Sequence, residues 1–350
     1  MPRPIPSQQD PWLAVNLSMI FSGLGLIYVG RRWEGLLFGL VQSGAIAFVG
    51  WSIFGASGNT ALGLHFILPT IFIYVVSLFE TYRSVTGGSI LEAQHHLKSR
   101  QDPWFAVFLS QVIPGLGHLY AKRLWLSVAF MVGTIVVLTL TAFSVRFMVL
   151  PPLLFAIACY HSYTLFPGRL TKAKTLLVAI VTGAFILRLL LGSAPVWIRY
   201  QVEFFTIPSG SMLPTLQVKD RILVYKSRNY QPQTGDIVVF RPPQTTGEGA
   251  VWGKFYVKRV IGKPLEAIEV KAGLVYINNQ PLQEPYLGEA PDYQWGPAIV
   301  PGQSYFMMGD NRNNSVDSHV WGFLPAQNIV GRAYKIYWPP QRIQPLRSLP

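Results

Sequence analysis

The sequence has a single cysteine, Cys159, among its 350 residues. Because a disulfide needs two thiols, this excludes an internal disulfide framework. Charged residues are also scarce: they make up 13% of the chain, whereas hydrophobic residues make up 50%, a balance too apolar for an ordinary soluble protein. The histidines are scattered without the Cys/His or His/Glu spacing of a metal site, so we expect no metal and no other cofactor.

Acidic residues are outnumbered, with 16 Asp and Glu against 29 Lys and Arg and a formal net charge of +13. The excess is spread along the chain: residues 1–203 carry 14 basic against 6 acidic residues, and residues 204–350 carry 15 against 10. A nucleic-acid-binding protein would show clustered basic residues or a known motif. Neither occurs, so we expect no nucleic-acid partner.

Long apolar tracts fill the N-terminal half. Each is close to the length of about 20 residues that a helix needs to cross the hydrocarbon core of a bilayer. We therefore predict a membrane α-helical N-terminal half, with the lipid bilayer as a partner. The tracts cover residues 35–55, 61–79, 124–143, 147–166 and 175–192.

This half contains an internal repeat. Asp10-Pro-Trp-Leu-Ala-Val15 recurs as Asp102-Pro-Trp-Phe-Ala-Val107, and a Gly-Leu-Gly element follows in both copies at the same offset of 92. A fixed offset of this kind indicates tandem duplication of one membrane unit.

The number of crossings depends on the tract that opens each copy, which Gly-Leu-Gly interrupts. If both opening tracts span, there are seven crossings and the Lys and Arg of the loops up to residue 174 divide six to six between the two sides. If both are re-entrant or interfacial, there are five crossings and the division is eleven cis against one trans, Arg146. The positive-inside rule favours five, and seven stays open.

The pattern changes after Phe204 to short runs rich in Val, Ile and Tyr, separated by Gly and Pro. Such runs predict an all-β domain. Val275 to Leu282 is typical of a hairpin that turns at Asn278 and Asn279.

Four motifs follow one another in this half. A hydroxyl lies between Gly and Met in Ile207-Pro-Ser-Gly-Ser-Met-Leu-Pro-Thr-Leu216, and Gly235–Phe240, Tyr256–Gly262 and Gly309–Ser318 come after it. With these motifs the chain resembles, across roughly residues 204 to 338, the type I signal peptidases, which are membrane-bound Ser/Lys proteases. The resemblance implies an up-and-down β-fold that carries the active site.

The resemblance implies Ser211 as the nucleophile and Lys258 as its base. A serine hydroxyl becomes a good nucleophile only when a base removes its proton, and a lysine can do so only when burial keeps its amine neutral. The resemblance also implies Ser209 and the backbone N–H of Ser211 as oxyanion donors, and Ser315, Asp317 and Arg312 as support. A Ser211/His319/Asp317 triad of the more familiar type is the alternative.

The substrate pocket implied by the resemblance is shallow and apolar. Such a pocket accepts small side chains and rejects large ones, which fits the Ala-x-Ala-like end of signal peptides. The sequence departs from the family pattern after the strand that carries Lys258, where Pro264-Leu265-Glu266 replaces the family's Pro-Gly-Asp. The implied lining residues are Phe205, Ile207, Pro208, Met212, Leu216, Tyr256 and Val257.

We therefore expect a membrane-bound serine endopeptidase that cleaves signal peptides from exported preproteins in a bacterial cytoplasmic or thylakoid-type membrane. Its catalytic domain is expected on the trans side, periplasmic or lumenal, with the export machinery as a candidate partner. The alternatives are a Ser/Lys peptidase dedicated to one substrate and a membrane scaffold that binds signal peptides without turnover. The expected parts are membrane repeat 1 at 1–100, membrane repeat 2 at 101–168, a final transmembrane helix and tether at 169–203, the catalytic domain at 204–340 and a C-terminal tail at 341–350.

Overall fold

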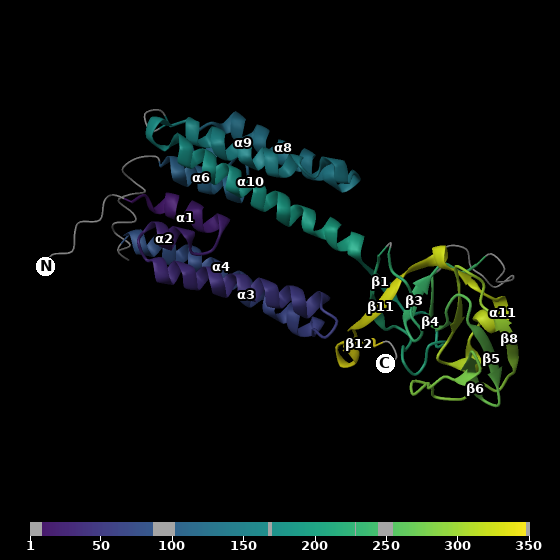
Figure 1. Ribbon diagram of the computed structural model, residues 1–350. Helices are drawn as coiled ribbons and strands as arrows, with labels where there is room; N and C mark the ends of the chain where they lie inside the picture. The colour runs from purple at the N-terminus through teal and green to yellow at the C-terminus, as the bar shows by residue number, and fades with distance from the viewer. Residues whose placement is uncertain (1–8, 87–101, 167–169, 228, 244–254, 348–350) are drawn as a thin grey trace. The chain divides into compact units, whose positions relative to one another are not determined.

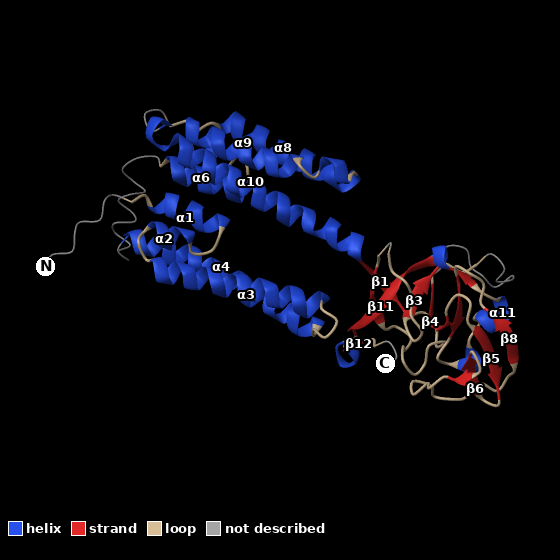
Figure 2. Ribbon diagram, viewed as in Figure 1, coloured by secondary structure: helices blue, strands red, loops and turns tan. Residues whose placement is uncertain are grey.

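The structure is a computed structural model that describes residues 9–86, 102–166, 170–227, 229–243 and 255–347. Contacts between Cα atoms divide the chain into two units, one of residues 1–48 and 66–195 and one of residues 49–65 and 196–350. Helices form the N-terminal half and antiparallel strands the C-terminal half (Figures 1 and 2). The predicted fold class is therefore confirmed. The boundaries of the five expected parts remain predictions.

The helices of the N-terminal half occur in the same order in both copies of the repeat, as two short helices followed by two long ones. A final long helix, α10, ends at Gln201, and strand β1 begins at the next residue. The helices are α1 (Pro11–Ile20), α2 (Leu24–Tyr28), α3 (Arg32–Phe54), α4 (Thr60–Thr86), α6 (Pro103–Val112), α7 (Leu116–Tyr120), α8 (Leu124–Phe143), the 3-10 helix η1 (Val145–Phe147), α9 (Leu150–Thr164) and α10 (Leu170–Gln201).

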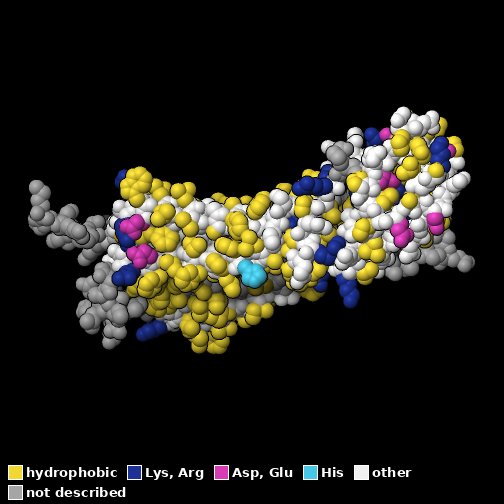
Figure 3. Space-filling model, turned by 90° about the horizontal axis from the view of Figure 1, so that it is seen from below, with side chains coloured by type: hydrophobic (Ala, Val, Ile, Leu, Met, Phe, Trp, Pro, Cys, Tyr) yellow, Lys and Arg dark blue, Asp and Glu magenta, His cyan; other side chains and the backbone are white. Residues whose placement is uncertain are grey.

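Within the described residues, five helical segments are long and apolar enough to cross a membrane: 32–54, 60–86, 124–143, 145–164 and 173–201. Hydrophobic side chains accordingly cover much of the helical region on the face drawn in Figure 3. The opening tracts are different. Each is broken into a helix of 10 residues and a helix of 5, and 10 residues rise only about 15 Å.

Both opening tracts begin and turn in the same way. The Asp10 carboxylate accepts from the backbone N–H of Trp12, and the Asp102 carboxylate accepts from that of Trp104, so each aspartate caps its helix. A Cβ atom on Gly25 would lie 2.1 Å from the Ala14 carbonyl oxygen. A Cβ atom on Gly117, the counterpart of Gly25 in the second copy, would lie 2.2 Å from the Ala106 carbonyl oxygen. The glycines therefore let the second short helix pack closely against the first.

The C-terminal half contains two antiparallel sheets. The larger has the order β1-β2-β11-β3-β4-β9-β10 with β12 paired to β11, and the smaller has the order β7-β6-β5-β8. The strands are β1 (Val202–Thr206), β2 (Arg221–Tyr225), β3 (Ile237–Phe240), β4 (Tyr256–Gly262), β5 (Ala267–Lys271), β6 (Leu274–Ile277), β7 (Gln280–Pro281), β8 (Trp295–Ile299), β9 (Ser304–Met308), β10 (Leu324–Pro325), β11 (Ile329–Trp338) and β12 (Gln344–Pro345), and the short helices are η2 (Arg312–Asn314), α11 (Ser318–Trp321), η3 (Ala326–Asn328) and η4 (Pro340–Arg342).

The predicted hairpin is confirmed. Ile277 pairs with Gln280 across a two-residue turn, in which Asn278 and Asn279 have φ angles of +50° and +64°. Asparagine tolerates this left-handed backbone better than most residues do, and a turn of this kind matches the twist of the two strands it joins.

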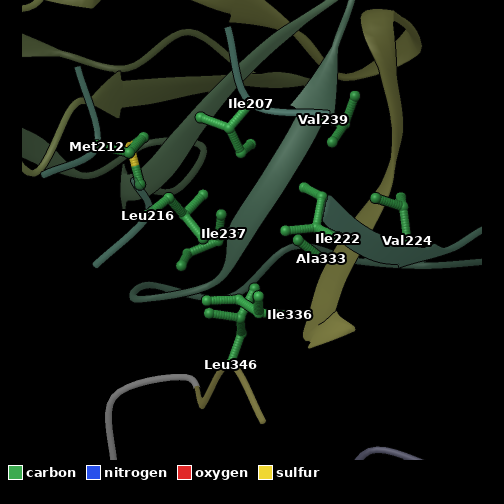
Figure 4. Close-up of a cluster of buried hydrophobic side chains, with 10 residues drawn as sticks. All are labelled: Ile207, Met212, Leu216, Ile222, Val224, Ile237, Val239, Ala333, Ile336 and Leu346. Carbon is green, nitrogen blue, oxygen red and sulfur yellow. The ribbon is translucent and has the colours of Figure 1, made fainter. Parts of the chain in front are cut away.

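Two buried hydrophobic clusters support the strands and loops that carry the four motifs. One buried cluster, which we call the nucleophile-side core, joins the segment after β1 to β2, β3 and β11 (Figure 4). A second links β4 and β9 of the larger sheet with β5 and β6 of the smaller. The nucleophile-side core consists of Ile207, Met212, Leu216, Ile222, Val224, Ile237, Val239, Ala333, Ile336 and Leu346.

Candidate active site

Ser211 and Lys258 meet in the β domain. Ser211 lies in the loop between β1 and β2, and Lys258 lies on β4, where it pairs with Val238 of β3. The Nζ atom of Lys258 is 2.6 Å from Oγ of Ser211, within hydrogen-bond distance. The two residues are 47 positions apart in the sequence, so only the pairing of the sheet brings them together.

The surroundings of Lys258 favour its neutral form. Its side chain is buried, with a relative exposure of 4%. Burial lowers the pKa of the amine from its ordinary value of 10.5 to about 8, although the negative charges of Asp317 and Asp310 act in the opposite direction. A solvent-exposed lysine would be almost wholly protonated at neutral pH. Lys258 therefore keeps a usable fraction of free amine beside the serine.

A cleft of about 580 Å³ opens beside these two residues. Five of the seven predicted pocket residues line it: Ile207, Pro208, Met212, Tyr256 and Val257. Ser209, the predicted oxyanion donor, lies exposed on the same wall. The lining residues that the sequence analysis missed are Gly210, Phe255, Asn314 and Val316.

The other two predicted pocket residues have different positions. Leu216 is fully buried in the nucleophile-side core, because the loop after Ser211 turns it inward. Phe205 packs edge-on against Phe255, with 5.1 Å between ring centroids, and it is Phe255 that lines the cleft. Both residues thus pack behind the residues that line the cleft.

Asp317 organises the predicted supporting residues. Its Oδ2 atom accepts a hydrogen bond of 2.6 Å from the Ser315 hydroxyl and one of 2.8 Å from the backbone N–H of Gly309. Its Oδ1 atom lies 2.7 Å from Nδ1 of His319. Arg312 supports the same region through other contacts. Its buried guanidinium forms an ion pair with Glu284 and donates to the Gly309 carbonyl.

A family model described as signal peptidase, peptidase S26, matches residues 177–338. Signal peptidase I of Leptolyngbya laminosa is 49% identical over 147 residues, which are 41% of this chain and 72% of that protein. Probable signal peptidase I-1 of Synechocystis is 50% identical over 139 residues, 39% of this chain and 71% of that protein. Probable thylakoidal processing peptidase 2 of Arabidopsis thaliana is 40% identical over 141 residues, 39% of this chain and 38% of that protein.

The chain belongs to the signal peptidase I family. Members of peptidase family S26 are serine endopeptidases, and this chain is one of them. The family match starts inside α10 and ends with β11. Helices α1 to α9 therefore lie outside it, as the resemblance had implied.

Three further residues hold this signal peptidase site together and were not predicted. Arg259, next to Lys258, makes a buried bidentate ion pair with Asp310, with distances of 2.8 and 2.6 Å. The Asn311 backbone N–H donates to the Ser211 carbonyl, and its side-chain amide donates to the Gly210 carbonyl, each at 3.1 Å. Asp310 and Asn311 both lie inside the Gly309–Ser318 motif, so the motif could have indicated them.

Proposed function

We propose that this chain is a membrane-bound peptidase that removes signal peptides from preproteins by a Ser211/Lys258 mechanism. The observation that carries the proposal is the distance of 2.6 Å between Nζ of Lys258, whose side chain is buried, and Oγ of Ser211. The signal peptidases of Leptolyngbya and Synechocystis, which are 49% and 50% identical to this chain over the aligned residues, support the choice of substrate.

In this mechanism the neutral Lys258 amine accepts the Ser211 proton as Oγ attacks the scissile carbonyl carbon. The tetrahedral intermediate carries its negative charge on the former carbonyl oxygen, where the Ser209 hydroxyl and the Ser211 N–H donate hydrogen bonds. Collapse breaks the C–N bond, and the lysine ammonium returns its proton to the leaving amine. Water, deprotonated by the same amine, then hydrolyses the acyl-enzyme and regenerates Ser211.

The cleft fits the small residues that precede a signal-peptide cleavage site. Apolar side chains of Ile207, Met212 and Val257 line it next to the nucleophile. An extended substrate can lie along a strand edge and place alternate side chains in the wall. Bulky side chains at the cleavage site would overpack these contacts.

The helical half suits an integral membrane protein. Five helical segments among the described residues are long and apolar enough to span a bilayer, and the charge distribution of the loops favours the cis side for the basic linkers. This orientation puts the catalytic domain on the trans side. The relatives named probable signal peptidase I-1 of Synechocystis and probable thylakoidal processing peptidase 2 of Arabidopsis thaliana support a bacterial cytoplasmic or thylakoid-type membrane, where the export machinery would deliver the substrate.

The test is cleavage of a preprotein by the purified full-length protein in detergent. Ser211→Ala and Lys258→Ala should each abolish cleavage while the protein stays folded, because nucleophile and base act as one unit. Ser227→Ala and Lys263→Ala, which lie outside the cleft, are the matched controls and should keep parental turnover. Cleavage at the parental rate by Lys258→Ala would disprove the mechanism.

A further inference from the structure

The last described residues are not a free tail. After β11, the chain turns through η4 and forms β12, which pairs back on β11 of the larger sheet, with Gln344 opposite Ile336. Leu346 then donates its backbone N–H to the Tyr334 carbonyl at 2.9 Å. Its side chain, only 6% exposed, belongs to the nucleophile-side core together with Met212 and Leu216 (Figure 4). The C-terminal segment thus packs under the loop that carries Ser211.

Arg342 in this segment grips that loop at two points. Its Nε atom donates to Oδ1 of Asp220 at 2.8 Å, and its Nη2 atom donates to Oδ2 of Asp220 at 2.8 Å and to the Thr215 carbonyl at 3.1 Å. The Asp220 side chain is 1% exposed. A bidentate, charge-assisted pair of this geometry fixes direction as well as distance.

The gripped residues define a closed loop around Ser211. The Ile207 N–H donates to the Asp220 carbonyl at 2.8 Å, and the Lys219 N–H donates back to the Ile207 carbonyl at 2.9 Å. Thr215, midway along the loop, is held from its other side as well, because its hydroxyl donates to Asp310 at 2.5 Å. Asp310 in turn pairs with Arg259 beside Lys258. The loop is therefore fixed between the lysine strand and the C-terminal segment.

We infer that Arg342 is a positioning residue for the proposed reaction: it holds the loop 207–220 so that the Ser211 hydroxyl stays beside Lys258. The inference rests on the proposed function for its catalytic consequence. Arg342 lies four residues beyond the family match, which ends at residue 338. The contact therefore belongs to the part of the chain that the sequence analysis expected to be a tail.

Arginine suits this position better than lysine does. The guanidinium reaches a carboxylate and a backbone carbonyl at once through a rigid fork of donors, whereas an ammonium is a point charge on a flexible stem. A displacement of the reacting atoms by about 1 Å can reduce catalysis about a hundredfold. Because Arg342 contacts the loop at Thr215 and Asp220, neither of which lines the cleft, its loss should affect kcat more than substrate binding.

The experiment compares Arg342→Gln with Arg347→Gln in the full-length protein. Arg347 is an exposed arginine in the same segment, so its replacement makes the same change in charge. Arg342→Gln should lower kcat about 10- to 100-fold with KM within about twofold, and it should speed amide hydrogen exchange in residues 207–220. Arg347→Gln should match the parent in all three measurements.

Asp220→Asn tests the same contact from the other side. If the two residues act through one pair, the double variant should lose no more activity than the worse single variant. Should Arg342→Gln fail to fold, Arg342→Lys keeps the charge and loses the fork, and it should still lower kcat and speed exchange.

Parental kcat and parental exchange in a folded Arg342 variant would overturn the inference. Failure of the proposed function gives a different result: the parent would cleave no preprotein, while hydrogen exchange would still report whether Arg342 holds the loop.

Discussion

Nδ1 of His319 lies 2.7 Å from Oδ1 of Asp317, and the imidazole stacks on Tyr293 with 4.3 Å between ring centroids. A histidine beside an aspartate is half of the alternative triad. In the structure, however, the group within hydrogen-bond distance of the Ser211 hydroxyl is Lys258. His319 therefore fits a role in holding Asp317, which in turn holds Ser315 and Gly309.

His319→Ala should reduce turnover by less than about tenfold, because removal of a true general base costs about 10²- to 10⁴-fold. Steady-state cleavage of a preprotein by the full-length protein measures this, with Lys258→Ala as the comparison. A loss as complete as that of Lys258→Ala would favour the triad.

The pH dependence of cleavage should follow the Lys258 amine. Only the neutral amine accepts a proton, and burial lowers its pKa to about 8. The value of kcat/KM should therefore rise about tenfold per pH unit below pH 8 and level off above it. A profile measured from pH 5 to 10 checks this. A plateau already reached at pH 7 would show that a group of lower pKa is the base.

Leu265 has a left-handed backbone, with φ at +69°, and its side chain is 75% exposed. This is the position at which the sequence departs from the Pro-Gly-Asp pattern. Because an L-residue in this conformation costs about 1 to 2 kcal/mol that glycine avoids, Leu265→Gly should raise the free energy of unfolding by about 1 kcal/mol. Denaturant unfolding followed by circular dichroism measures it.

The matched control for Leu265 is Leu274→Gly. Leu274 is also exposed, at 46%, but it lies in strand β6. There glycine should lower stability, since a strand restricts the freedom that glycine has in the unfolded chain. Equal destabilisation by both variants would contradict the strain at Leu265.

The five-crossing topology predicts opposite sides for Ser57 and Ser89. Ser57 is exposed in the turn between α3 and α4, and Ser89 lies outside the described residues. After replacement of Cys159 by Ala, single cysteines are introduced at each position. An impermeant thiol reagent on the trans side should label position 57 and spare position 89, because the basic linkers favour the cis side. The reverse pattern would establish seven crossings.

The amino-acid order alone specified the local features of the chain. Apolar tracts of spanning length predicted the five helical segments that are long enough to cross a membrane, and short runs rich in Val, Ile and Tyr predicted the β domain that follows them. Those features depend on neighbouring residues, so they can be read in a short window. The motif carrying Ser211 could be recognised for the same reason.

Which side chains meet was decided by the tertiary structure. Leu216 was expected in the pocket, yet it is buried in the core. Whether a loop side chain faces the cleft or the core depends on the residues that pack against the loop, and these come from distant parts of the sequence. Arg342 lies 122 residues from Asp220 and 127 from Thr215, and no short-range pattern records a pairing at that separation. The sequence supplies Ser211 and Lys258, the proposed nucleophile and base. The antiparallel pairing of β11 with β2, β3 and β12 brings the residues that hold the Ser211 loop into reach.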